Sequence, residues 1–391
     1  FARSFKEAQA YLIPLMLIAF APGLLSLNPA LKTNSLLAIV PLLNVVMVGR
    51  DLLAGNANMM YVFLAILSTC FYGLFALAWA ARIFGADSIL TGGFEPWSQM
   101  FSGTSPSRPC PTVSTALLFL AVLFPLFVVA AGLVSNLATR AEATVEQRLW
   151  LNALVTILVF AGLPLAFVFF FRLSPGSTFQ LQAPTLVGVA AAVMLGLSVW
   201  VIAYESEVIS LSSKRLKEMM DWFASLKLGL NQVPLWVKLV CLALVPAVCE
   251  EFTFRGFLLT AFRRRTTAAN AVFITALLFG LFHVFVRDLL FLERMIPSTL
   301  MGLLLGFVCI RTGSIWPGML LHAIHNGLLI TLAHYEDWLV QFGFGASEQS
   351  HLPWLWILIA MVPASIGMAM LLFNQRRTPI PDRSTVVGSF D

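Results

Sequence analysis

Long apolar runs recur along the whole chain and constrain its fold more than any other feature. Each run approaches the roughly 20 residues that an α-helix needs to cross a bilayer. Of the 391 residues, 59% are hydrophobic and 11% are charged, whereas about 25% of the residues in soluble domains are charged. The sequence therefore predicts an all-α integral membrane protein and excludes an ordinary soluble domain.

About eleven apolar helical segments are predicted from their length and flanking polarity. They are Tyr11–Leu27, Leu36–Val48, Tyr61–Ala81, Thr115–Val134, Leu149–Phe171, Thr185–Tyr204, Pro234–Phe262, Ala271–Phe285, Ile296–Ile310, Ile315–Leu332 and Trp354–Phe373. The second segment is short and contains Pro41 and Asn44. These features leave open whether it spans the membrane or re-enters it.

Two connections divide the chain. Residues 85–113 are rich in Gly, Ser and Pro and predict a linker between membrane segments at 1–84 and a membrane domain at 114–375. In that domain, residues 207–232 carry an apolar stripe at helical spacing with charges off the stripe, which predicts an amphipathic helix on the membrane surface. Residues 376–391 form a basic tail.

The basic residues indicate an orientation rather than a nucleic-acid partner. The formal charge is +5, but Lys and Arg gather near the ends of apolar segments, as the positive-inside bias predicts. Arg263, Arg264, Arg265 and Arg311 fall on the same side as the tail, so we expect a cytoplasmic C-terminus. The chain begins with Phe1 and shows no signal-peptide pattern, which favours a fragment or a processed form.

Three charged residues lie within six positions of one apolar segment. They are Glu250, Glu251 and Arg255, and each charge inside a membrane helix costs roughly 2.5–3.5 kcal/mol on insertion scales. Glu251 and Arg255 are spaced i, i+4, so they share a helix face and can pair. Glu250 points about a third of a turn away, toward a different neighbour. The alternative is that this helix starts at the membrane surface and all three charges contact water.

Buried polar groups recur in the segments that follow. The chain has five histidines, and His283, His322 and His325 lie inside apolar runs. His322 and Asn326 are spaced i, i+4 and project from one face. A lone histidine in a helix is more often a hydrogen-bonded core residue, but polar groups on several neighbouring helices can satisfy one another at a shared point. We therefore predict a polar centre formed by Glu250, His283, His322 and Asn326.

These residues form three motifs in a fixed order. The motifs are Glu250-Glu251-Phe-Thr-Phe-Arg255 (EExxxR), Phe279 to His283 (FxxxH) and His322 to Asn326 (HxxxN). In this order on successive helices, they resemble the CPBP family, which includes CAAX prenyl endopeptidases and bacteriocin-processing or immunity proteins. The resemblance implies an eight-helix bundle and an intramembrane endopeptidase that hydrolyses a hydrophobic or lipidated, membrane-associated peptide.

The resemblance also implies a role for each residue. Glu250 would be the general base that activates a water molecule, and His283 would help to hold the same water. His322 and Asn326 would donate hydrogen bonds to the oxyanion. Glu251 and Arg255 would form a supporting ion pair.

A metal ion is an open question at this stage. Glu250, His283 and His322 could supply the Glu/His₂ ligand set of a zinc ion. No HExxH helix is present, and the chemistry can also proceed on glutamate alone. We favour a mechanism with no obligatory metal.

The N-terminal part carries a second resemblance. Ser4–Tyr11, Ile39–Asn44 and Arg50–Gly55 resemble the C-terminal portion of the permease subunit of a sodium- or drug-export ABC transporter, in a bacterial cytoplasmic (inner) membrane. The chain has no P-loop, so the ATPase would be a separate subunit. Two alternatives to the peptidase therefore stay open, namely an export permease with a non-catalytic CPBP domain and a peptide-binding immunity protein.

Overall fold

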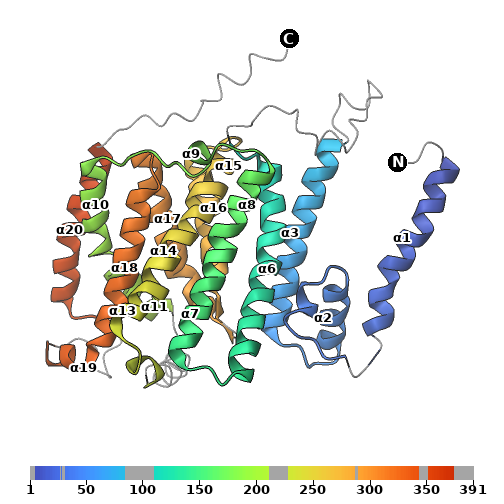
Figure 1. Ribbon diagram of the computed structural model, residues 1–391, viewed down its shortest axis with the longest axis horizontal. Helices are drawn as coiled ribbons and strands as arrows, with labels where there is room; N and C mark the ends of the chain where they lie inside the picture. Colours follow the sequence, from blue (N-terminus) through green and yellow to red (C-terminus); the bar gives the residue numbers. More distant parts are fainter. Residues whose placement is uncertain are drawn as a thin grey trace, which may run out of the picture. The chain divides into compact units, whose positions relative to one another are not determined.

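The computed structural model describes residues 5–26, 28, 31–83, 110–210, 228–286, 289–342 and 351–373 (Figure 1). Most of the predicted linker, the centre of the predicted amphipathic helix at 211–227 and the basic tail lie outside these residues. Contacts divide the chain into two units. The first comprises Phe1–Phe94, Leu117–Leu133 and Arg287–Leu290, and the second comprises the remainder.

Helices form almost all of the described structure. Seven of them are long and apolar enough to cross a membrane by length and composition. These are Gln9–Ser26, Met59–Ala80, Val113–Arg140, Val145–Phe170, Leu186–Ser206, Leu292–Thr312 and Trp354–Phe373. The prediction of an all-α, multi-pass membrane protein is confirmed.

Four further predicted segments contain helices that are not among the seven. They are the short helix at 43–53 and the helical segments 235–263, 268–283 and 316–334. The last three carry the ionisable and amide groups singled out in the sequence. Three of the four segments outside the seven therefore hold the predicted polar centre.

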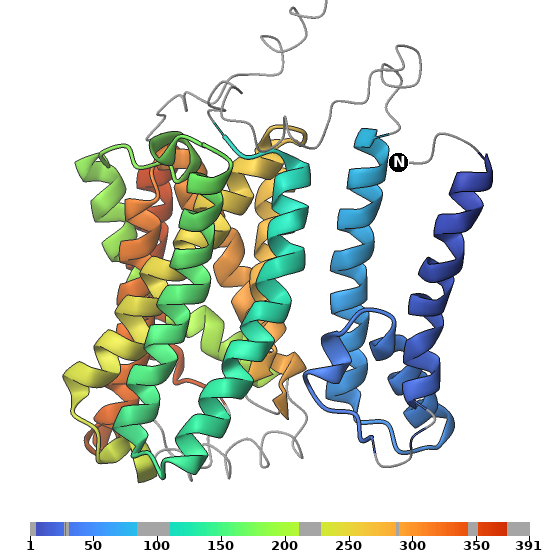
Figure 2. The same cartoon turned by 45° about the vertical axis from the view of Figure 1, so that its right-hand side comes forward.

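The first unit contains a short helical segment between two long helices. Helix α1 (Phe5–Ser26) leads to the short turn η1 (Leu37–Ile39) and helix α2 (Leu43–Leu53), and α3 (Met59–Ile83) follows. Figure 2 shows α2 at the end of the unit where α1 stops and α3 starts. The 11 residues of α2 span only about 16 Å, too little to cross a bilayer.

Side chains of α3 stabilise this short segment. The buried Asn44 donates from Nδ2 to Ser68 Oγ at 3.1 Å and to Thr69 Oγ1 at 2.9 Å. The Tyr72 hydroxyl donates to the carbonyl of Ile39 at 2.9 Å. Non-helical backbone at membrane depth is tolerated only where other groups satisfy it, and α3 supplies these groups.

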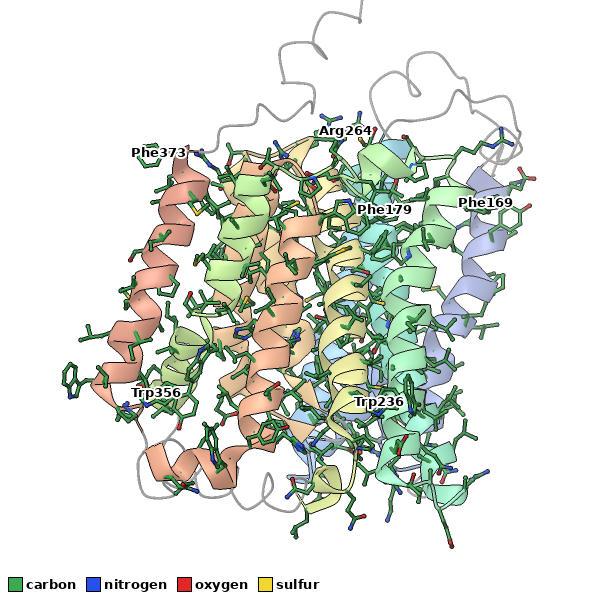
Figure 3. The ribbon with its side chains drawn as sticks, turned by 60° about the vertical axis from the view of Figure 1, so that its left-hand side comes forward. Phe169, Phe179, Trp236, Arg264, Trp356 and Phe373 are labelled. Carbon is green, nitrogen blue, oxygen red and sulfur yellow. The ribbon has the colours of Figure 1, made fainter. Side chains whose placement is uncertain are left out.

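The second unit is built from the remaining helices, most of which run along one common direction (Figures 1 and 3). The middle of α6 (Val113–Arg140) belongs to the first unit and its two ends belong to the second. The first half of the second unit also contains α7 (Val145–Thr156), η2 (Ile157–Gly162), α8 (Leu163–Phe170), α9 (Pro175–Thr178), α10 (Leu186–Gly196) and α11 (Trp200–Ser210). Then follow α13 (Leu235–Leu239), η3 (Val240–Leu244), α14 (Val245–Glu251), η4 (Phe252–Leu258), α15 (Leu259–Arg263) and α16 (Ala268–His283). The last are η5 (Leu292–Arg294), α17 (Met295–Thr312), α18 (Trp316–His334), α19 (Glu336–Leu339), η6 (Val340–Phe342) and α20 (Trp354–Phe373). The described extended segments are β1 (Phe285–Val286) and β2 (Leu289–Leu290), with two residues each.

Threonine residues mark the start of several helices. The hydroxyls of Thr112, Thr144, Thr185 and Thr267 accept hydrogen bonds from backbone N–H groups in the first turns of α6, α7, α10 and α16. Such N-caps satisfy donors that a helix leaves free. The predicted single segment Thr185–Tyr204 is interrupted between α10 and α11, where Ser198 Oγ donates to the Met194 carbonyl at 2.6 Å. A serine that bonds back to the preceding turn bends a helix.

The surface and interior of the second unit are inverted relative to a soluble protein. Large apolar side chains of α20 face outward, with Ile359 61% and Phe373 87% exposed, whereas Glu251 and Arg255 are fully buried. Trp236 and Trp356 lie toward one end of this unit and Arg264 lies at the other (Figure 3). Tryptophans at one boundary and arginines at another are typical of a membrane-embedded bundle.

Helices α16 and α17 approach closely because small residues face each other. A Cβ atom at Gly302 would lie 2.8 Å from Cα of Ala276, and one at Gly280 would lie 2.9 Å from the Met295 carbonyl oxygen. Contacts of small residues allow helix backbones to approach within a membrane. This approach brings a backbone carbonyl of α17 next to the polar centre.

Candidate active site

The acidic pair lies in a helical segment that contains two wide turns. Helix α14 ends at Glu251, and both η3 before it and η4 after it are π-helical. Pro246 is at the start of α14, and a proline cannot donate the usual i→i−4 bond, so the preceding turn widens. Such π-helical turns occur frequently at functional sites because they change which side chains share a face.

Glu251 and Arg255 form a fully buried ion pair. Arg255 Nη1 lies 2.8 Å from Glu251 Oε1, and neither side chain is exposed. Arg255 Nη2 donates to the Gly302 carbonyl of α17 at 3.2 Å. A buried charge is tolerated when it is paired and hydrogen-bonded. The interpretation in which all three charges contact water therefore fails for Glu251 and Arg255.

His322 shares the oxygen that binds Arg255. Its Nδ1 atom lies 3.2 Å from Glu251 Oε1, and its side chain is only 4% exposed. The contact connects α14 with α18, which meet directly in the bundle. A carboxylate next to one imidazole nitrogen fixes the ring orientation and leaves the other nitrogen to face the site.

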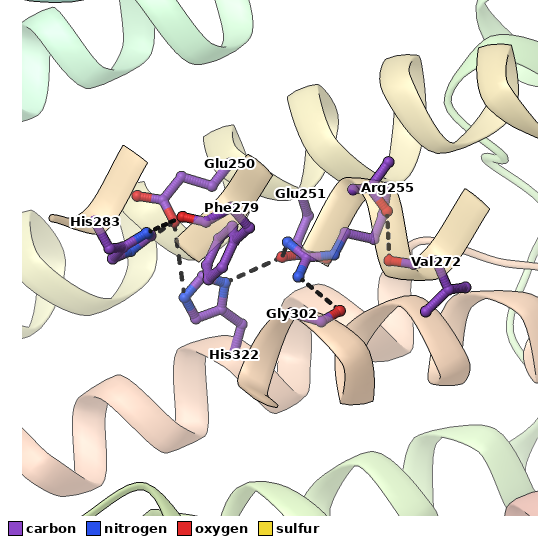
Figure 4. A network of polar contacts seen from close by, with 9 residues as sticks. Glu250, Glu251, Arg255, Val272, Phe279, His283, Gly302 and His322 are labelled. Atoms are coloured by element: carbon purple, nitrogen blue, oxygen red, sulfur yellow. Dashed lines mark hydrogen bonds and ion pairs between the residues drawn. The ribbon is translucent and has the colours of Figure 1, made fainter. Parts of the chain in front are cut away.

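Glu250 faces both imidazoles (Figure 4). Its Oε2 atom lies 3.8 Å from His283 Nε2 and 4.0 Å from His322 Nε2. The Glu250 and His283 side chains are 15% and 27% exposed, so this side of the centre is nearer the outside than the ion pair. Glu250 Oε2 is buried and has no hydrogen-bond partner among the described residues.

The contact of Nδ1 in each imidazole determines whether the Nε2 atom that faces Glu250 donates or accepts. His283 Nδ1 lies 2.7 Å from the Phe279 carbonyl, and a carbonyl only accepts, so Nδ1 donates. His322 Nδ1 likewise faces a carboxylate oxygen. In their neutral forms, both rings therefore present an Nε2 lone pair to Glu250. Three acceptor atoms around one point require a donor between them.

A water molecule fits this spacing better than a zinc ion does. Two ligands of a tetrahedral zinc lie about 3.3–3.5 Å apart when the metal–ligand bonds are about 2.0–2.2 Å, and the observed separations from Glu250 are 3.8 and 4.0 Å. Among the described residues, no group of three His, Cys, Asp or Glu side chains is arranged to hold a metal ion. A bridging water forms hydrogen bonds of about 2.7–3.0 Å to each neighbour, which these separations permit.

Phe279 is a site residue whose role the sequence did not reveal. Its ring centroid lies 4.3 Å from that of His283 and 5.8 Å from that of His322. The Arg255 guanidinium carbon lies 4.4 Å from the same ring. The i, i+4 spacing to His283 places Phe279 on the same helix face, which was the available signal. The phenyl ring thus lies against both imidazoles and the guanidinium.

The other predicted polar residues are arranged differently. Asn326 lies one turn after His322 on α18 and is half-buried, and the described part of the chain gives it no hydrogen bond to the other three residues. His325 is 6% exposed, and its Nδ1 atom has no partner among the described residues. His334 and His351 contact Lys238 and Glu205 instead. The structure therefore brings Glu250, Glu251, Arg255, His283 and His322 together, with Asn326 adjacent.

Comparison with known proteins gives one match to a family. Residues 232–328 match the family described as Type II CAAX prenyl endopeptidase Rce1-like. This range contains the acidic pair, Arg255, both site imidazoles and Asn326. No curated protein and no solved structure matches the chain. The match supports a CAAX-type protease family for this part of the C-terminal half, and it does not extend to residues 1–84.

Proposed function

We propose that the chain is an intramembrane endopeptidase that hydrolyses a membrane-associated or lipophilic peptide. One observation carries the proposal. Glu250 Oε2, buried and without a partner among the described residues, faces the Nε2 atoms of His283 and His322 at 3.8 and 4.0 Å. This arrangement suits a water molecule held between a carboxylate and two imidazoles, next to a general base.

Glu250 acts as the base in this proposal. The water donates one hydrogen bond to Glu250 and a second to an imidazole Nε2, so an oxygen lone pair points toward the substrate. Glu250 takes a proton as the oxygen attacks the peptide carbonyl carbon, and the same carboxyl group returns that proton to the leaving amine when the C–N bond breaks. General acid–base catalysis of this kind contributes typically 10²–10⁴-fold to the rate.

The oxyanion is stabilised from α18. Asn326, one turn after His322, supplies a donor to the tetrahedral intermediate, and His322, held by Glu251, supplies a second donor when its Nε2 atom carries a proton. Preorganised donors of this type contribute about 10²–10³-fold each. Glu251 and Arg255 support the centre by fixing the His322 ring, and they do not contact the substrate.

The remaining assignments follow from the sequence. The protein resides in a bacterial cytoplasmic (inner) membrane with its C-terminus in the cytoplasm, because the basic residues gather on that side. Its substrate is a hydrophobic or lipidated peptide, and a separate ABC ATPase is the partner if the first 84 residues belong to an exporter permease.

The experiment is cleavage of fluorogenic lipidated peptides by the full chain in liposomes. Glu250→Gln is expected to lower the cleavage rate at least 10³-fold, because an amide cannot accept the proton. Glu142→Gln, at an exposed position after α6, is the matched control and should retain the wild-type rate. Cleavage that persists in the Glu250→Gln protein would refute the mechanism.

Binding without cleavage separates the peptidase from its alternatives. If the wild-type protein binds the labelled peptides but never cuts them, the result supports the peptide-binding immunity protein. Peptide movement that needs an added ATPase and tolerates Glu250→Gln supports the export permease.

A further inference from the structure

A short segment after α9 crosses the π-helical turn that carries Arg255. Phe179, at the end of α9, packs directly on Gly256, where a Cβ atom would lie 2.7 Å from Phe179 Cδ1 and 3.3 Å from Phe179 Cα. Only glycine leaves room for this approach. The next residue, Gln180, therefore lies against the backbone of η4.

Gln180 connects this turn to α15 and to the start of α18. Its Nε2 atom donates to the Arg255 carbonyl at 3.3 Å and to Thr260 Oγ1 at 3.1 Å. Its own carbonyl accepts from the N–H of Ile315 at 3.1 Å, at the start of α18. The side chain is buried, at 3% exposed. One residue thus binds both helical segments that meet at the Glu251–His322 contact.

The backbone of Gln180 is held in an uncommon conformation. Its φ is +51°, in the left-handed region that residues other than glycine seldom adopt. Such strain persists where the surroundings over-determine the residue, often near functional sites. Here a glycine would relieve the strain and lose the amide, so the contacts of the amide explain why a glutamine occupies the position.

The Gln180 amide bonds to the Arg255 carbonyl in η4, where a π-helical turn changes the helical hydrogen-bond register. The same arrangement occurs in η2, where the Phe160 carbonyl accepts from Thr253 Oγ1 at 2.6 Å. Side chains that bond to such carbonyls can stabilise a wide turn against the regular α-helical register. Thr253 and Gln180 thus brace η2 and η4, respectively, from outside each turn.

We infer that Gln180 is a positioning residue for the polar centre. By holding the Arg255 backbone and the start of α18, it sets the distance between Glu251 and His322, and through His322 the position of Nε2 opposite Glu250. The inference deepens the proposed peptidase function and rests on it for the activity readout. Gln180 is outside residues 232–328, the range that matches the peptidase family.

The test uses Gln180→Met in the full chain, because methionine has a similar volume and no amide. Nitrogen-15 NMR of labelled histidines in liposomes reports the protonation pattern of the His322 ring, assigned with His322→Gln. We expect a changed His322 signal and a roughly tenfold fall in kcat for lipidated peptides at unchanged KM. Gln232→Met, at an exposed position before α13, is the matched control and should leave both readouts unchanged.

A second variant covers failure of Gln180→Met to fold. Thr260→Val keeps the side-chain shape and removes one of the two acceptors of the Gln180 amide, so a smaller shift of the His322 signal is expected. A wild-type His322 signal in the folded variants would overturn the inference. If the wild-type protein cleaves no peptide, the proposed function fails, whereas the NMR signal still decides the role of Gln180.

Discussion

Oε1 of Glu251 is the common partner of a guanidinium and an imidazole, with His322 Nδ1 at 3.2 Å and Arg255 Nη1 at 2.8 Å. The other oxygen of Glu251 is buried without a partner among the described residues. A single carboxylate oxygen therefore connects the helix that carries the acidic pair with α18. Removing the charge of Glu251 or of Arg255 should change the stability of the fold, which can be measured without an activity assay.

Glu251→Gln should destabilise the fold strongly. The change leaves the fully buried Arg255 without its counter-charge, and breaking a buried pair costs about 3–5 kcal/mol. Arg255→Met should cost a similar amount, because it leaves Glu251 unpaired. Thermal unfolding in detergent measures both effects.

The double variant Glu251→Gln, Arg255→Met is the control for that prediction. Because it removes both charges, we expect it to recover most of the stability lost in each single variant. If the losses of the single variants simply add, the two side chains do not depend on one another, and the interpretation of a coupled pair is wrong.

Phe279→Leu should alter the histidines more than it alters the fold. Leucine fills much of the space but removes the ring that contacts His283 and the Arg255 guanidinium, and a desolvated cation–π contact is worth about 2 kcal/mol. We expect a roughly tenfold slower cleavage and a shift in the His283 imidazole NMR signal. The matched control is Phe282→Leu, since Phe282 is also buried but makes edge-to-face contacts with Phe160 and Phe254. An unchanged His283 signal in Phe279→Leu would contradict the role given to Phe279.

Gly302→Ala should separate α16 from α17. The added methyl group would lie 2.8 Å from Ala276 Cα, and overpacking of this kind costs typically about 1–3 kcal/mol. The Gly302 carbonyl would also move from Arg255 Nη2. Unfolding in detergent should show the loss, whereas Gly73→Ala, where no atom lies within 4 Å of the new Cβ, should show none. Equal stability of both variants would refute the close-packing argument.

Chelators should leave cleavage unchanged. The separations of 3.8 and 4.0 Å between Glu250 and the two imidazoles exceed the ligand spacing of a tetrahedral zinc of about 3.3–3.5 Å. Treatment with EDTA or phenanthroline, followed by dialysis and elemental analysis, checks this point. Loss of activity that returns when zinc is added would show that the three side chains close around a metal.

The sequence predicted those parts of the fold and site that depend on local periodicity. Apolar run length placed the helices, and the i, i+4 spacing correctly paired Glu251 with Arg255. The same rule placed Asn326 on the face of His322, but it could not reveal whether the amide reaches the other groups. Ser198 interrupts a segment that looked continuous, because a side-chain bond to Met194 competes with the helical ladder.

Contacts distant in sequence were not predictable from the pattern. Gln180 is 75 positions from Arg255 and lies in a segment without a recognisable motif. The π-helical turns on either side of α14 are also invisible to a fixed helical period, although Pro246 signals the first. The motif FxxxH contains Phe279, but its contacts with two imidazoles and a guanidinium depend on how three helices pack.

The polar side chains of segments 235–263 and 316–334, which are not among the seven apolar spans, bear on biosynthesis. In segment 235–263, each Glu or Arg raises the free energy of transfer from the translocon into lipid by about 2.5–3.5 kcal/mol, and segment 316–334 adds the polar side chains of His322, His325 and Asn326. These two helices would therefore partition poorly as isolated segments during translation. Their stable insertion depends on earlier helices already in the bilayer and on each other, so the ionisable groups become embedded only as the bundle closes.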